Sequence, residues 1–458
     1  MERFFNSKAM AGLQKFGQKL GTNKFITALQ AAMMSLMGIL MVGAIFQIIT
    51  SVLGPTMFGV LSDKSVIFNY LNIPYQFSMN SLSLWVVLFL AFNYAKTLKI
   101  ETPIMSAINA LFSFLIVAGA LVVAKSGAVS IDMTYLGAQG MFIGFVVVFI
   151  SVQVEKFCID KNIRIKMPDV VPPFLQDGFS AILPLFFNAI IFLAASLAVT
   201  VLTAGKLTIT SGFMALLAAP LSALTSTVGI FILCIFGALL WVFGIHGTMI
   251  LVPIIMPLSI QAVSANAALH AAGKPVVFYP VMLFAYMAIA GGTGNTLALA
   301  LMSLRSKSKQ LSAVGKISAI PGWFNINEPM TFGIPIMYNP IMSIPYVLNI
   351  PVVMLCALVL YKVGFFVPGW IVITALLPMG FGSYLSTLSW TNAIGDYLML
   401  IPSAIVWYPF FKVYEKQLVA KEAKAAAEEA AQAKKQAAVI SADHDDTPTM
   451  GTHEAQPE

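Results

Sequence analysis

The sequence predicts an all-α integral membrane protein with about ten transmembrane helices. Hydrophobic residues make up 59% of the 458 residues and charged residues only 10%, whereas roughly a quarter of an average soluble domain is charged. Apolar runs of at least about 18 residues, enough to cross a bilayer, recur along the chain. Lys and Arg gather between these runs, which indicates membrane topology rather than a nucleic-acid surface. The composition therefore excludes a soluble enzyme and a nucleic-acid binder.

Basic clusters set the expected topology of the N-terminal half. They lie in residues 1–25, at Lys96 and Lys99, and in residues 155–178, and the polar gaps between them carry single lysines such as Lys64 and Lys206. Positive residues mark cytoplasmic loops, so we expect the N-terminus and these clusters in the cytoplasm. This alternation predicts five spans, at residues 26–53, 77–95, 103–124, 136–154 and 179–203.

The C-terminal half does not fit a simple alternation of spans. The basic cluster at 305–316 and the Lys-bearing tail should both face the cytoplasm, but counting spans in and out does not place both there. Glycines and prolines interrupt the apolar runs, and broken backbone at membrane depth persists only where protein buries it or where it lines a wet cavity. We therefore expect re-entrant segments, or long stretches that split into two spans. The apolar stretches are 212–260, 277–304, 319–361, 365–390 and 394–411.

Four parts of the chain follow from this pattern. Residues 1–25 are a basic cytoplasmic N-terminus, 26–210 form scaffold helices, and 211–411 form a site-bearing half. Residues 412–458 are a cytoplasmic polar helix to about 440 followed by a disordered tail. The three cysteines are far apart and lack metal or disulfide spacing, so we expect no metal and no other cofactor.

Two ionisable residues inside apolar stretches are candidates for function. His246 lies in the run Trp241–Thr248, and Glu328 follows Asn325 and Asn327. Ionisable groups at membrane depth are energetically expensive, so each is a functional hypothesis, although a buried His can also be a structural hydrogen-bonding group. The carboxylate, the amides and the neighbouring Trp323 and Phe324 together suit a sugar, because they offer acceptors for hydroxyls and flat faces for the ring.

A glycine-rich stretch, Gly291-Gly292-Thr293-Gly294-Asn295-Thr296, is similar to a phosphate-cradling turn. It lacks the lysine of a P-loop, and no strand is expected before it. We therefore interpret it as a turn that exposes backbone N–H groups near a cavity.

The segment from Asn325-Ile326-Asn327-Glu328-Pro329 to Gly333-Ile334-Pro335, followed by Asn339-Pro340, resembles the signature of the IIC permease component of the bacterial sugar phosphotransferase system. Within that system it is most similar to the lactose/cellobiose/diacetylchitobiose family. Three further segments match in the same order: Met167-Pro168-Asp169 with Phe179-Ser180-Ala181, Trp241–Gly247, and the glycine turn. The similarity runs from about residue 25 to 411.

The resemblance implies a homodimer in the bacterial inner membrane, surrounded by lipid, with both termini cytoplasmic and with the dimer contact in the N-terminal half. It implies two re-entrant hairpins in the C-terminal half, near 278–304 and 318–338, with one sugar held between them. By motif match, Glu328 orients or deprotonates the sugar's 6-hydroxyl and His246 forms a neighbouring hydrogen bond. The residues that the resemblance places at the sugar are Trp241, His246, Gly292, Gly294, Asn325, Asn327, Glu328 and Trp390.

The resemblance also implies a disaccharide substrate such as cellobiose or diacetylchitobiose, and a separate soluble IIB subunit whose phosphocysteine phosphorylates it. IIB itself receives the phosphoryl group through enzyme I, HPr and IIA. None of the three cysteines here fits that donor, so we expect it to act in trans. Many relatives carry a Pro-Trp-Thr element in the late helices, whereas residues 373–380 here read Ile-Thr-Ala-Leu-Leu-Pro-Met-Gly, so this Trp is missing.

Two other functions are compatible with the composition alone. A proton-coupled secondary sugar transporter would use Glu328 and His246 as a proton relay, and a passive channel or membrane scaffold would use neither. Phosphorylation-coupled uptake differs from both because its internal product is a phosphosugar.

Overall fold

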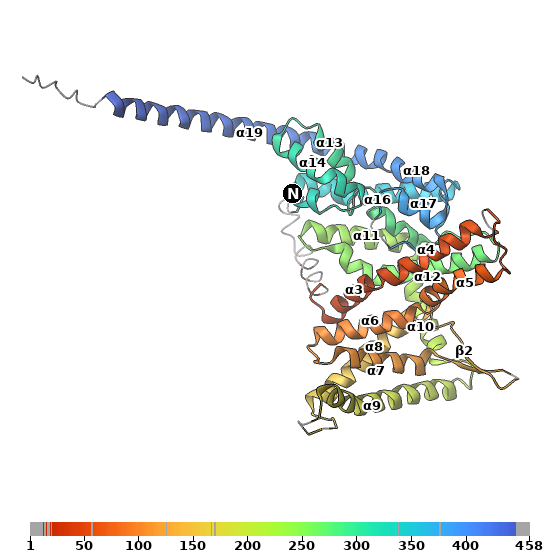
Figure 1. Cartoon of the computed structure of the whole chain (residues 1–458). Coiled ribbons are helices and arrows are strands. Elements are labelled where there is room, and N and C mark those ends of the chain that lie inside the picture. The colour runs from red at the N-terminus through yellow and green to blue at the C-terminus, as the bar shows by residue number, and fades with distance from the viewer. Residues whose placement is uncertain are drawn as a thin grey trace, which may run out of the picture.

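The computed structural model describes residues 21–445 except 56–57, 125, 166, 169–170, 335, 338 and 375–376, together with residues 12, 15 and 19. Most of the basic N-terminus, the end of the tail, and Asp169 and Pro335 of the motifs above lie outside the described residues. The described chain folds as a stack of helices with one small β-hairpin (Figure 1).

Every span predicted for the N-terminal half contains helix. The helices are α3 (Lys24–Ser35), α4 (Met37–Leu53), α5 (Val66–Met79), α6 (Leu82–Thr97), α7 (Pro103–Ala118), α8 (Met141–Asp160, after a 3₁₀ turn η1 at Ala138–Gly140) and α9 (Pro173–Leu202).

The expected span 103–124 is too long, because α7 ends at Ala118. The next residues form an antiparallel ribbon, β1 (Leu121–Val123) and β2 (Val129–Ile131), which pairs Leu121 with Ile131. Both strands are exposed, and the ribbon projects from the stack in Figure 1. Gly119 ends the helix, and the β-branched residues that follow it favour a strand over a further helical turn.

The C-terminal half contains more elements, and several of them are short. They are α10 (Ile209–Thr225), α11 (Thr227–Val242), α12 (Gly247–Ala271), the 3₁₀ helix η2 (Pro280–Met287), α13 (Leu297–Leu304), α14 (Lys309–Trp323), α15 (Glu328–Gly333), α16 (Pro340–Lys362), α17 (Phe381–Thr387), α18 (Trp390–Leu398) and α19 (Leu400–Asp445). The predicted final span, 394–411, begins in α18, and its residues from Leu400 onward continue into the polar tail as one helix, α19. The far end of α19 leaves the body of the protein (Figure 1).

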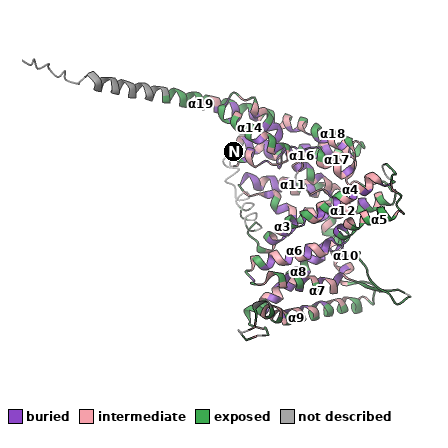
Figure 2. Ribbon diagram, viewed as in Figure 1, coloured by how far each residue is buried: buried purple, intermediate pink, exposed green. Residues whose placement is uncertain are grey.

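Two large hydrophobic cores correspond to the two halves. One contains buried residues of α3, α6, α7 and α8, and the other contains buried residues from α11 to α19. Helix α12 joins them, because Ile260 belongs to the first core and Leu251, Ile255 and Leu258 belong to the second. Figure 2 shows α9 largely exposed at the edge of the stack. It packs on α7 and α8 along one face, and most of its remaining apolar surface is exposed among the described residues.

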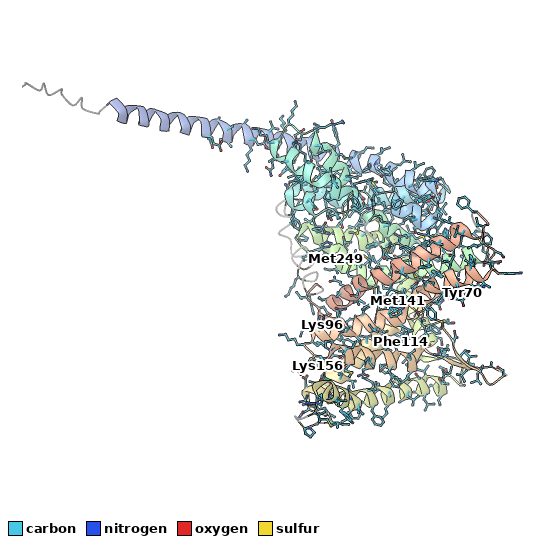
Figure 3. All side chains as sticks on the ribbon, in the orientation of Figure 1. Tyr70, Lys96, Phe114, Met141, Lys156 and Met249 are labelled. Carbon is cyan, nitrogen blue, oxygen red and sulfur yellow. The ribbon has the colours of Figure 1, made fainter. Side chains whose placement is uncertain are left out.

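By length and composition, six of the described helices can cross a membrane, or up to eight if each of two bent pairs is one span. The expected count of about ten is therefore not confirmed. The bent pairs are α5 with α6 and α10 with α11, with bends of 41° and 68°. Lys96 and Lys156, from two of the basic clusters, lie at the same end of the stack, and Tyr70 lies at the opposite end (Figure 3). This is the arrangement that the charge pattern predicts.

Candidate functional site

His246 stands at the start of α12, just after the chain reverses from α11. As the N-cap residue, its Nδ1 accepts a hydrogen bond from the Met249 N–H at 3.3 Å. The first N–H groups of a helix lack partners within the helix, so this bond both caps α12 and fixes the ring. In the neutral imidazole, Nδ1 is then the acceptor and Nε2 carries the proton.

The proton-bearing Nε2 of His246 faces Glu328. The distance from Nε2 to Glu328 Oε1 is 3.6 Å, slightly longer than a direct hydrogen bond. Both side chains remain accessible, with 34% of His246 and 43% of Glu328 exposed. Residues 82 positions apart thus form an accessible donor–acceptor pair, with His246 on α12 and Glu328 at the first position of α15.

Trp241 lies behind this pair and does not line it. Its ring is 3% exposed, with its centroid 4.2 Å from that of His246 and 6.3 Å from that of Phe332. The sequence predicts that Trp241 contacts the sugar, but in this conformation its ring packs against the imidazole and helps to hold it in place.

The glycine turn is buried and packs against the Glu328 motif. Residues 291–300 are all buried, and the N–H groups of Gly292 and Gly294 donate to the carbonyls of Ala288 and Met287. The expectation that this turn exposes free N–H groups is therefore wrong for the conformation seen here. Gly292 and Gly294 instead support the site from behind.

Glycine is needed at Gly292 and Gly294 because the backbone is left-handed and crowded there. Their φ angles are +75° and +82°. A Cβ on Gly292 would lie 2.8 Å from the Asn325 carbonyl oxygen, and one on Gly294 would lie 2.5 Å from the Tyr346 ring. Any larger residue would push the turn away from the motif that it supports.

Asn325 and Asn327 join the two segments by hydrogen bonds. Asn325 Oδ1 accepts from the Gly291 N–H at 3.1 Å, and Asn327 Nδ2 donates to the Thr293 carbonyl at 3.3 Å. Asn327 is buried and also donates to Thr331 Oγ1 at 3.0 Å. Its amide therefore holds the motif together, whereas Asn325 is partly exposed.

Three residues that the sequence motifs do not identify complete this network. Tyr346 on α16 is buried beneath Gly294, with its hydroxyl 3.5 Å from Asn327 Nδ2. From α19, Ser403 Oγ donates to the Asn295 carbonyl at 2.8 Å and Trp407 Nε1 donates to the Gly294 carbonyl at 3.3 Å. All three lie in ordinary apolar runs with no local motif, so only the fold identifies them.

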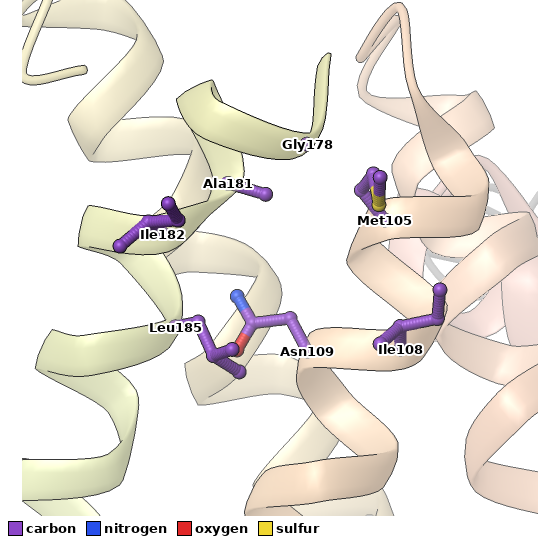
Figure 4. A pocket seen from close by; sticks show the side chains of 7 residues that line it. All are labelled: Met105, Ile108, Asn109, Gly178, Ala181, Ile182 and Leu185. Atoms are coloured by element: carbon purple, nitrogen blue, oxygen red, sulfur yellow. The ribbon is translucent and has the colours of Figure 1, made fainter. Parts of the chain in front are cut away.

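A hollow in the N-terminal half of the molecule is a weaker candidate for a ligand site. It lies between α7 and α9 (Figure 4) and measures about 130 Å³, below the roughly 300 Å³ of a typical ligand site. Its lining is apolar except for Asn109, whose Oδ1 already accepts a bond from Asn188. In the described part of the chain, no group of three or more His, Cys, Asp or Glu side chains could hold a metal ion.

Comparison with known proteins identifies the family. The model of the family described as "Phosphotransferase system, EIIC" matches residues 30–349, which include both His246 and Glu328. The chain belongs to this EIIC family. Among EIIC relatives, the oligo-beta-mannoside-specific EIIC component of Bacillus subtilis (strain 168) is 30% identical over 90% of this chain and 95% of its own length.

Longer relatives and a solved structure agree. The lactose-specific EIICB component of Streptococcus mutans is 30% identical over 89% of this chain and 72% of its own length. The crystal structure of the transporter ChbC, the IIC component of the N,N'-diacetylchitobiose-specific phosphotransferase system, superposes with a TM-score of 0.81. It is 26% identical, and the match covers 92% of this chain and 99% of ChbC. These relatives do not favour the proton-coupled transporter.

The EIIC fold leaves Trp390 outside the pair of His246 and Glu328. Trp390 begins α18, is 68% exposed and packs on Tyr384 at a centroid distance of 4.4 Å. In the described residues, none of its contacts reaches that pair. Its role at the sugar stays a prediction, and this structure does not support it.

Trp323 lies beside the stretch where the late Trp is missing. Its backbone carbonyl accepts from the Met379 N–H at 2.8 Å, and its Nε1 donates to the Tyr397 hydroxyl at 2.9 Å. Its ring is 42% exposed. Trp323 therefore offers an accessible indole face only five residues before Glu328, next to residues 377–380.

Proposed function

We propose that this EIIC protein carries a β-linked disaccharide across the membrane and presents its 6-hydroxyl to the phosphocysteine of a separate IIB protein. The observation that carries the proposal is the pair formed by His246 and Glu328. A donor Nε2–H and an acceptor carboxylate 3.6 Å apart, both partly exposed, can each reach one hydroxyl oxygen placed about 2.8 Å from both.

The pair suits the chemistry of phosphoryl transfer. The sugar oxygen forms a new O–P bond while the S–P bond of the donor breaks, and the donor cysteine leaves as a thiolate. The hydroxyl proton must be removed, and Glu328 is placed to take it as a general base. His246, with its Nδ1 held by Met249, orients the hydroxyl through Nε2–H. Positioning of the two oxygens and removal of the proton are the contributions that we assign to this chain.

A neutral disaccharide is the substrate class that we propose. The named relatives act on oligo-β-mannosides, lactose and diacetylchitobiose, all of which contain β-linked sugar rings. Trp323 supplies an exposed aromatic face for a ring. Asn325, whose Oδ1 accepts from the Gly291 N–H, supplies its Nδ2 as a donor to a hydroxyl. No Lys or Arg lies close to Glu328 in the sequence, so an acidic sugar would bring an unpaired charge into a low-dielectric site.

The partners follow from the same proposal. Relatives named EIICB support a IIB donor, which would be recharged by enzyme I, HPr and IIA. We place the exposed basic residues Lys307 and Lys309, the N-terminus and the tail on the cytoplasmic side, where this donor acts. The uncovered apolar surface of α9 supports a homodimer formed through the N-terminal half, with the site moving between the two sides of the membrane.

Reconstituted vesicles test the proposal. With enzyme I, HPr, IIA, IIB and phosphoenolpyruvate inside, radiolabelled diacetylchitobiose or cellobiose should accumulate as its phosphate ester. Vesicles without IIB should accumulate no phosphorylated sugar. Accumulation of free sugar driven by a pH gradient, without any phosphoryl donor, would contradict the proposal and favour a proton-coupled secondary transporter instead.

A further inference from the structure

Helix α19 packs along the segment that joins the glycine turn to Glu328. We call residues 291–328 the site hairpin: it begins with the glycine turn, continues through α13 and α14, which pack on each other, and ends at Glu328. Helix α19 packs against both α13 and α14. At the base of the site hairpin, Ser403 and Trp407 of α19 donate to the carbonyls of Asn295 and Gly294.

At the tip of the site hairpin, α19 makes a second set of bonds through Glu415. Glu415 Oε1 accepts from Ser306 Oγ at 2.7 Å and from the Lys307 N–H at 3.0 Å. Its other carboxylate oxygen pairs with Lys412 Nζ at 2.8 Å. The glutamate is 7% exposed, so the loop between α13 and α14 is held by a largely buried acceptor.

Glu422, two turns further along α19, binds the start of α14. Its carboxylate accepts from Ser308 Oγ at 2.7 Å, from the Lys309 N–H at 3.0 Å and from the Gln310 N–H at 3.1 Å. The N–H groups at the start of a helix have no partner inside it, and the helix dipole favours a negative charge there. Glu422 therefore caps α14 from another helix.

These bonds are specific to Glu415 and Glu422. Glu428, on the same helix, makes only an exposed pair with Lys424 at 3.8 Å. Such surface pairs stabilise little. Two of the tail glutamates thus have a structural partner in the site hairpin, and Glu428 provides a matched control for both.

We infer that Glu415 and Glu422 are positioning residues for the transfer step. They fix the tip of the site hairpin to α19, which also holds its base, so the site hairpin and α19 move as one body. Glu328 belongs to this body, whereas His246 stands on α12. The bonds at the tip therefore help to set the distance between the two. The catalytic part of this inference rests on the proposed function, but its mechanical part does not.

Helix α14 is long enough for a small tilt at the tip to move Glu328. Helix α14 has 15 residues and is roughly 22 Å long at 1.5 Å per residue. A tilt of about 3° at one end therefore displaces the other end by roughly 1 Å, and a misplacement of that size can lower a rate about 100-fold.

Hydrogen exchange on the full chain in detergent tests the mechanical part. The double variant Glu415→Ala/Glu422→Ala should exchange at least about tenfold faster, both at the tip (307–311) and at the base (291–297 and 324–331). Glu428→Ala should exchange like the wild type. Should the double variant fail to fold, Glu422→Gln, which loses one acceptor oxygen, is measured instead. Unchanged exchange at the base, or the same change in Glu428→Ala, would overturn the inference.

Phosphorylation in the vesicles tests the catalytic part. Per molecule of bound sugar, the rate should fall about 10- to 100-fold in the double variant, while the Kd for sugar changes less than about threefold. A merely structural role would lower the amount of folded protein and leave the rate per bound sugar unchanged. If the wild type phosphorylates no disaccharide, the proposed function fails, and the exchange experiment still decides whether α19 holds the site hairpin.

Discussion

The two halves of this EIIC protein differ in how their backbone N–H and C=O groups are hydrogen-bonded. In the N-terminal half, long helices such as α8 and α9 satisfy their own backbone groups, and the core formed by α3, α6, α7 and α8 is mostly apolar. In the C-terminal half, the breaks around Gly292 and Asn325 leave backbone groups that side chains from distant helices must bind. This difference explains the polar network around the candidate site, because broken backbone at membrane depth requires polar neighbours.

One carboxylate in each half makes the comparison concrete. Glu155 on α8 is 4% exposed and lies beside Ser106 and Asn109 of α7. The Glu328 side chain is 43% exposed and faces His246. The first is enclosed among helices, where it joins elements of the scaffold, whereas the second is open to a ligand. Exposure, rather than the presence of a carboxylate, separates the two.

The largest expected effect comes from exchanging each carboxylate for an amide. Glu328→Gln keeps the shape but removes the base, so phosphorylation should fall about 10²- to 10⁴-fold while sugar binding weakens only slightly. Glu155→Gln should leave the rate per folded molecule unchanged. Initial rates of phosphosugar formation check both variants. Wild-type rates in Glu328→Gln would remove this residue from the chemistry.

The next effect concerns the glycines. Gly292→Ala puts a Cβ 2.8 Å from the Asn325 carbonyl oxygen, at a φ of +75°, and should lower transport about 100-fold by displacing the Glu328 motif. Gly38→Ala, in helix α4, meets nothing within 4 Å and should be neutral or slightly stabilising. Uptake and thermal unfolding of both variants provide the comparison. Equal behaviour would show that the turn does not support the site.

The smallest effect comes from a substitution that separates the two roles of His246, which caps α12 and faces Glu328. Asn is a good N-cap residue, so His246→Asn should preserve the start of α12 and the Tm. Its shorter side chain no longer reaches Glu328, and the phosphorylation rate should fall about tenfold. His270→Asn is the control, because His270 stacks on Trp370 at 3.7 Å, away from the pair. An unchanged rate in His246→Asn would limit this residue to capping.

Helical spans and site residues differ in how far sequence alone could predict them. Each N-terminal span contains helix because a continuous apolar run reports directly on a membrane helix. The end of the third span was wrong, because hydropathy does not distinguish the residues of β1 from helical ones. The sequence motifs also singled out His246 and Glu328, and the fold brings them together.

The supporting contacts could not be predicted. The buried state of the glycine turn depends on Tyr346 and Trp407, which lie 52 and 113 positions beyond Gly294. The contacts of Glu415 and Glu422 could not be predicted either. Both residues lie in a stretch of α19 whose composition predicts only a polar helix. Long-range contacts of this kind leave no local pattern in a single sequence.

The most direct measurement of where the sugar binds is photolabelling of the full protein. Diacetylchitobiose carrying a diazirine, irradiated with the purified protein in detergent and mapped by mass spectrometry, should label peptides that contain residues 323–328 and 241–248. Excess unlabelled disaccharide should prevent this labelling. Labelling that instead concentrates on residues 105–109 and 178–185, around the hollow between α7 and α9, would contradict the assignment of the site to the C-terminal half.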